Sequence, residues 1–394
     1  MKKTLNVNAG TALLLGDRLD AFSGYESVHI NAGNALASRK AYEKLMGMGA
    51  SLNSGNMTVL DIEGKPAELP ENTVITASSA YDGCYLVCDG NLVIEDAKGL
   101  GGVTGLYAET LFHPDTVDLS HVKGITAPAR VVYPDGAKLR FGKMTLGGDA
   151  HILFEENTLY WVHGKLTALD EEAVRKLHDR KIKFHCRSLI VYNGLYERYR
   201  ELFEADSYQL IPDGHAVVED ISLDAATAPL YGGKLFVLGD MMIPHDQAAH
   251  LSGFSSLIVN GTVTMPVTAA AAFRAVGKAN EYDLYEGVLM AVNGRQTLGR
   301  EQLQSALDRG ISYTLKVNGM LEILGDVTAE DIGAIAAVYC NGMIKAPGAA
   351  RGALDSKIRE MNGNICGYEE AAPNAFNADG DDETEQINIG TFRL

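Results

Sequence analysis

Length, composition and charge set the first limits on this chain. It has 394 residues, of which 46% are hydrophobic and 22% are charged, and this balance excludes an intrinsically disordered chain. Acidic side chains outnumber basic ones by 51 to 34, and the formal net charge of -17 disfavours nucleic acids and anionic membrane surfaces as partners.

The first residues and the cysteines predict where the protein resides. The N-terminal segment opens with two lysines, but its apolar stretch at residues 12–15 is too short for a signal peptide, and no other segment is apolar enough to cross a bilayer. The five cysteines are odd in number and scattered, unlike a secreted disulfide framework. We therefore expect a cytoplasmic protein.

A short apolar segment that ends in glycine, often preceded by asparagine, recurs along the chain. The copies are residues 30–33, 87–90, 160–164, 190–194, 235–239, 257–261, 315–319 and 338–342. Alternating apolar residues favour strands, and glycine is typical of positions where the backbone turns. The closing glycines from Gly10 to Gly342 divide this span into unequal steps that average about 24 residues, within the range of solenoid coils.

This spacing predicts an α/β repeat solenoid. We expect parallel strands stacked in about fourteen irregular coils of roughly 24 residues, with short helices or loops on the other side. Prolines five residues after a glycine, at Pro244, Pro266 and Pro347, are expected to end a strand and start the next element. Helices are expected at residues 170–180, 268–276, 302–309 and 328–337, the last with a capping box formed by Thr328 and Asp331.

A second interpretation of the glycines is possible. In a conventional pair of α/β domains, the Asn-Gly pairs would form the turns of β-hairpins. The regular spacing and the shared proline offset favour the solenoid.

At these motifs the chain resembles leucine-rich-repeat proteins and, more loosely, bacterial β-solenoid proteins. The resemblance covers most of residues 5–360 and implies an elongated repeat fold. The asparagines at Asn260, Asn318 and Asn341 directly follow the strand and precede glycine, whereas the leucine-rich consensus places its asparagine further on.

The last part of the chain differs in composition. We predict a solenoid domain at residues 1–360 and a C-terminal cap with an acidic tail at residues 361–394. Asn377, Asp379, Asp381 and Glu385 have some of the spacing of a calcium loop, but Asp382 and Asn388 replace its required glycine and glutamate. A solvated acidic tail is the alternative, and the apolar residues beyond it would cap the last coil or dock on another subunit.

No motif assigns a catalytic, cofactor-binding or metal-binding residue. Phosphate-loop, nucleophile-elbow and zinc-helix patterns do not occur in the sequence. Cys84 and Cys88 would share one face of a strand, but we expect them to be buried hydrophobes. His245 and His250 lie near Asp240 and Asp246 and could act as a general base or hold a metal, but we expect them to be polar surface or coil-edge residues. His163 beside Trp161 and His185 beside Cys186 are expected to be packed or turn residues.

These observations predict a non-catalytic scaffold that binds another protein or itself through an extended surface, without a cofactor. The alternative is an enzyme acting on a carbohydrate or another small substrate in a groove formed across neighbouring coils. Such a groove requires a cluster of titratable side chains from stacked strands, which no linear motif reveals.

Overall fold

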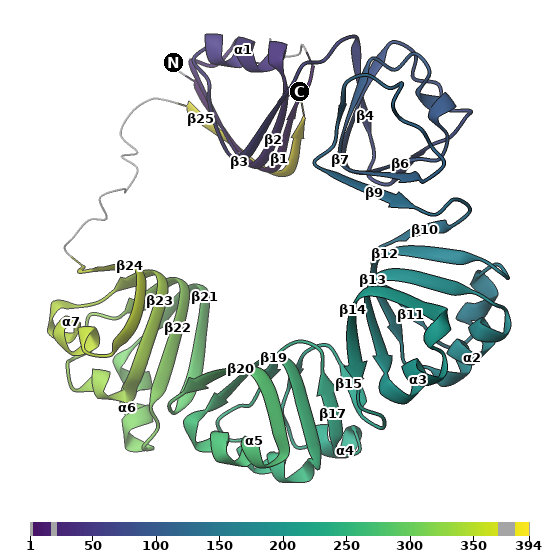
Figure 1. The fold of residues 1–394 in the computed structure, drawn as a ribbon. Helices are drawn as coiled ribbons and strands as arrows, with labels where there is room; N and C mark the ends of the chain where they lie inside the picture. The colour runs from purple at the N-terminus through teal and green to yellow at the C-terminus, as the bar shows by residue number, and fades with distance from the viewer. Residues whose placement is uncertain (1–2, 17–21, 369–382, 394) are drawn as a thin grey trace. The chain divides into compact units, whose positions relative to one another are not determined.

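The computed structural model describes residues 3–16, 22–368 and 383–393. The chain divides into two compact units, one made of residues 1–189, 199–207 and 377–394 and the other of residues 190–198 and 208–376. Mostly parallel strands form five open sheets among the described residues (Figure 1). No helix in this part of the chain is long and apolar enough to cross a membrane.

Each sheet contains strands that follow one another in the chain, with one exception. The N-terminal sheet has the order β25-β1-β2-β3, so that the last strand of the chain lies beside the first. Its elements are β1 (Lys3–Leu14), β2 (Ser27–Ser38), α1 (Arg39–Gly47), β3 (Ser51–Leu60) and β25 (Glu383–Arg393).

The second and third sheets follow in chain order. The second contains β4 (Lys65–Leu69), β5 (Thr73–Ile75), β6 (Cys84–Ile94), β7 (Gly105–Pro114), β8 (Ile125–Thr126) and β9 (Ala129–Tyr133), with the short helix η2 (Ala97–Leu100). The third contains β10 (Lys138–Phe141), β11 (Met144–Leu146), β12 (Leu159–Ala168), β13 (Lys183–Tyr192) and β14 (Phe203–Ile211), with η3 (Ala150–Leu153), α2 (Glu171–Asp179), α3 (Asn193–Arg198) and η4 (Arg200–Leu202).

The fourth and fifth sheets are likewise made of strands that follow one another in the chain. The fourth contains β15 (Ala216–Val218), β16 (Ile221–Ser222), β17 (Lys234–Val237), β18 (Met241–Met242), β19 (Ser256–Pro266) and β20 (Gly277–Tyr285), with α4 (Thr227–Leu230), η5 (Ala248–Gly253), η6 (Val267–Ala269) and α5 (Ala270–Val276). The fifth contains β21 (Val288–Leu298), β22 (Tyr313–Ile323), β23 (Ile335–Lys345) and β24 (Ile358–Cys366), with α6 (Arg300–Asp308), η7 (Asp331–Ala334) and α7 (Gly348–Asp355).

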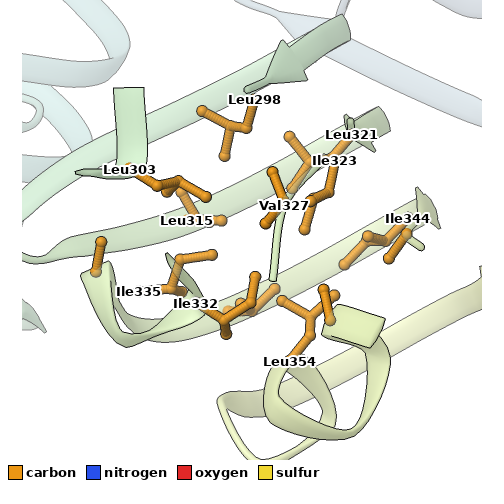
Figure 2. Packing of buried hydrophobic residues seen from close by; sticks show 14 of the residues in the cluster. Leu298, Leu303, Leu315, Leu321, Ile323, Val327, Ile332, Ile335, Ile344 and Leu354 are labelled. Atoms are coloured by element: carbon orange, nitrogen blue, oxygen red, sulfur yellow. The ribbon is translucent and has the colours of Figure 1, made fainter. Parts of the chain in front are cut away.

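The fifth sheet shows how the strands and the segments between them bury a common apolar core. Leu315 and Ile344 of neighbouring strands point into one apolar cluster, and Leu303 of α6 and Leu354 of α7 cover it from the side of the helices (Figure 2). These four side chains are completely buried. Since a parallel strand must be reached by a crossover, each helix or loop between strands supplies this cover.

Most of the Asn-Gly pairs lie inside parallel strands, whereas Asn193 and Gly194 begin α3. The hairpin interpretation is therefore wrong, as is a closing turn at the glycines inside strands. Asn318 of β22 pairs with Asn341 of β23, and the glycines that follow them pair likewise in a parallel register. Gly319 and Gly342 have φ angles of 129° and 147°, which favour glycine. A Cβ atom on Gly342 would also collide with the carbonyl oxygen of Gly319.

The helix predictions are mostly confirmed. The structure has α2, α5 and α6 at the predicted places, and Pro266 and Pro347 cap η6 and α7. The prediction at residues 328–337 is wrong in its second half, since only the short η7 forms before β23 begins at Ile335. The capping pair is present, with the Thr328 amide donating to Asp331 at 2.8 Å.

The predicted C-terminal segment, residues 361–394, contains the end of one strand and the whole of another in the structure. β24 extends to Cys366 and remains paired with β23, and β25 joins the N-terminal sheet. The division at residue 360 stays a prediction. Of the calcium-loop residues, Asn377, Asp379 and Asp381 lie outside the described residues.

Replacing Gly342 with alanine should destabilise the protein by about 2 kcal/mol or more, because the new Cβ atom meets the neighbouring backbone at a strained φ angle. Gly352→Ala is the matched control, since Gly352 lies in α7 with no atom within 4 Å of the added carbon. Chemical unfolding of both variants measures the difference. Equal unfolding free energies for the two variants would contradict the proposed packing.

Candidate functional site

The edge of β1 carries an added strand from the opposite end of the chain. Asn8 donates to Asn388 at 2.9 Å, and Asn31 of β2 donates to Asn8 at 3.0 Å, so that amide side chains form a row across three strands. Two residues further on, Gly10 and Gly390 approach so closely that a Cβ atom on Gly10 would lie 2.9 Å from the Gly390 carbonyl oxygen. The pattern Asn-x-Gly is therefore matched on all strands of this row.

Apolar and charged side chains fix β25 beside β1. Phe392 and Ile387 pack against the cluster that includes Leu5 and Val7, and the Phe392 ring lies 6.4 Å from that of Phe22. The Arg393 guanidinium is 3.1 Å from the Glu68 carboxylate. The Tyr25 hydroxyl donates to Glu385, and this hydrogen bond is the main reason that the pKa of Tyr25 is raised.

A second candidate site lies on the polar face of β12, β13 and β14. Trp161 stacks on His185 with ring centroids 3.7 Å apart and planes 10° apart. His185 in turn lies 3.6 Å from Glu204 and 3.9 Å from Asp206 on the next strand. Trp161, His185 and the two carboxylates thus form a row of contacting side chains across the three strands. Glu204 and Asp206 can both face His185 because alternate residues of a strand share one face.

This row borders a depression of about 370 Å³. Its walls are Thr110, Ala129, Val131, Trp161, Val162, His163, His185, Arg187 and Asp206. Burial is the main reason that the pKa of His163 is lowered, and the nearby Arg187 adds to the effect. A neutral imidazole beside a guanidinium and a carboxylate can exchange hydrogen bonds with a hydroxyl-bearing ligand.

The fifth sheet offers a third, more polar depression of about 430 Å³. The exposed amides of Asn318, Asn341 and Asn362 occupy successive strands there in register. Beside them, the Lys316 ammonium pairs with Asp283 and lies 5.8 Å from the centre of the Tyr339 ring. Both members of this ion pair line the depression.

The cysteines considered in the sequence are packing residues. Cys88 is buried and Cys84 is partly buried against the same apolar cluster. Burial raises the pKa of Cys88 to about 11 and that of Cys186 to about 12, so neither thiol is activated as a nucleophile. In the described part of the chain, no three His, Cys, Asp or Glu side chains gather as a metal site.

The structure separates two of the histidines considered and brings two others together. His245 borders a mainly apolar depression with Asp246 and Tyr285, whereas His250 lies in η5 outside its lining. His163 and His185 line one depression, although the sequence predicted each to be a packed or turn residue. The available signal was the repeated spacing Trp161-x-His163 and His185-x-Arg187 on adjacent strands.

Comparisons with known proteins yield no relative. No family model matches the chain, and no curated protein or solved structure matches it significantly. The comparisons therefore assign no family to this chain.

The environment of His163 predicts a pH dependence of stability. Because its pKa is lowered from the ordinary 6.5, the unfolded chain binds more protons at this side chain, and stability falls as the pH drops below that value. His163→Gln should therefore lose less unfolding free energy than the wild type between about pH 8 and about pH 5. Denaturant titrations at both pH values test this, and an unchanged pH dependence would contradict it.

Proposed function

We propose that this protein is a non-catalytic scaffold for self-assembly or protein binding, built as an α/β solenoid of about fourteen coils of roughly 24 residues. The observation that carries the proposal is the addition of β25 to the edge of β1. A segment remote in sequence completes a sheet made of consecutive strands. The edge of this sheet therefore functions as a receptor for a strand with a matching pattern.

The regular register of the strands supports the repeat architecture. Hydrogen-bonded asparagines on neighbouring strands lie 23 residues apart at Asn8 and Asn31, and 22 apart at Asn34 and Asn56. These steps have the length of one solenoid coil. Stacked coils present long surfaces and open sheet edges, which suit protein partners better than small molecules.

The net charge and the free cysteines support the proposed partners and cellular compartment of this scaffold. The formal net charge of -17 opposes binding to nucleic acids and anionic membranes. All five cysteines are free, which fits a reducing compartment, and we place the protein in the cytoplasm. Partners with basic surfaces would be attracted to it over distances of about 10 Å.

The scaffold function predicts association of the purified chain with itself. Its average mass should rise with protein concentration, and it should rise further in high salt because salt screens the repulsion between acidic copies. Size-exclusion chromatography with light scattering across both series measures this mass. A monomer at every concentration and salt level would contradict self-assembly.

A second function, binding or turnover of a carbohydrate or another small substrate, is favoured by the depression beside Trp161. It combines His163, Arg187 and Asp206 from neighbouring strands with the apolar walls of Val131 and Trp161. Saccharide hydroxyl groups both donate and accept hydrogen bonds, and these side chains offer both. This is the kind of lateral cluster that a groove enzyme on stacked strands requires.

This second function predicts saccharide binding that depends on Arg187. Arg187→Ala should weaken binding about tenfold, because a charged hydrogen bond contributes about 1.5 kcal/mol or more. Arg175→Ala, on the outer surface of α2 where the guanidinium pairs with Asp179, is the control. Calorimetry with a panel of soluble oligosaccharides measures both. Failure of every sugar to bind the wild type would exclude saccharides as ligands.

A further inference from the structure

The last strand of the chain depends on contacts with the first. The side chains of Asn388 and Asn8 are hydrogen-bonded across a sequence separation of 380 residues. β25 pairs with β1 along almost its whole length, from Lys3 opposite Glu383 to Leu13 opposite Arg393. Its neighbour in sequence, β24, pairs instead with β23 of another sheet. β25 is thus joined to its sheet by pairing and packing, and to the preceding strand only through residues 367–382.

Every copy of the chain presents the same receptor edge for β25. The backbone of β1, the Asn8 amide, the Phe22 ring and the Glu68 carboxylate would meet β25 in the same way whichever copy supplied it. We propose that β25 exchanges between copies, so that the strand of one chain completes the N-terminal sheet of a second. This inference rests on the proposed self-assembly function and names its partner and its route.

The pattern of β25 makes the exchange specific. It carries Asn388 and Gly390 with one residue between them, as do β1, β2 and β3, which carry Asn8 with Gly10, Asn31 with Gly33, and Asn53 with Gly55. The strands of the fifth sheet carry asparagine and glycine directly adjacent. In the fifth sheet, β25 could align either its asparagine or its glycine with the Asn-Gly pairs, but not both. A shift of one residue to align the other would turn every side chain of β25 to the opposite face of the sheet.

Loss of β25 leaves an edge that attracts a replacement. The outer backbone groups of β1 would lose their parallel partner, and the cluster around Leu5 and Val7 would lose the cover of Ile387 and Phe392. An exposed edge of this kind pairs readily with another strand. β25 makes the same contacts whether it comes from the same chain or from another chain. The ratio of exchanged to unexchanged chains therefore depends on the protein concentration relative to the effective concentration of the chain's own β25.

The exchange has two outcomes of different size. Two chains that swap β25 reciprocally form a closed dimer, whereas chains that each pass β25 to the next form an open series. Both forms increase with protein concentration, and both place residue 391 of one chain opposite residue 11 of another.

Disulfide trapping between differently tagged chains tests the exchange. Thr11 of β1 lies opposite Thr391 of β25, and Asn34 of β2 lies on the other side of Thr11. A mixture of full-length Thr11→Cys and Thr391→Cys chains should yield a disulfide-linked dimer under mild oxidation, since paired strands are close enough for this bond. An Asn34→Cys and Thr391→Cys mixture is the matched control, because β1 separates these positions.

The outcomes distinguish exchange from other forms of assembly. We expect about tenfold more linked dimer in the matched mixture than in the control, rising with concentration. The double variant Thr11→Cys with Thr391→Cys should form the bond within one chain at high dilution. A bond within the double variant but no dimer in the matched mixture overturns exchange, as does equal dimer in both mixtures or no bond in any sample. If the wild type still associates in light scattering, self-assembly stands without exchange.

Discussion

The close approach of neighbouring strands at columns of glycine is the constraint on which the sheets depend. In the fifth sheet, Gly319 and Gly342 combine positive φ angles with backbone contacts that leave no room for a side chain. The strands remain paired in register on both sides of these glycines. Since each glycine contacts the glycine of the adjacent strand, the column also aligns the strands. The apolar residues on either side of it then meet in one continuous core.

The spacing between asparagine and glycine differs between the N-terminal sheet and the fifth sheet. In the N-terminal sheet one residue separates Asn8 from Gly10, whereas in the fifth sheet Asn341 and Gly342 are adjacent. The chain therefore contains strands with similar cores and distinct polar patterns. β25 joins the sheet whose pattern it shares, and hydrogen bonds between amides reinforce that choice.

The sequence was sufficient to predict many of the strands and the helices α2, α5 and α6, because these depend on local patterns. Residues 170–180 and 302–309 show a helical pattern and form α2 and α6. The position of Gly319 inside a strand was not predictable from local turn preference, because its conformation depends on a neighbouring backbone. The candidate sites were missed for a related reason. Trp161 and His185 meet only through strand register, and the pairing of β25 with β1 links opposite ends of the sequence.

The separation between β1 and β25 also affects the order of events during synthesis. Asn8 of β1 precedes Asn388 of β25 by 380 residues, so the N-terminal sheet remains incomplete during translation until β25 has been synthesised. A nascent chain, or one truncated before residue 383, exposes the β1 edge and the apolar cluster beneath it. Exposed apolar surface and unpaired strand edges of this kind are prone to aggregation until β25 covers them. The pairing of β1 with β25 thus makes synthesis of β25 a condition for completing the N-terminal sheet.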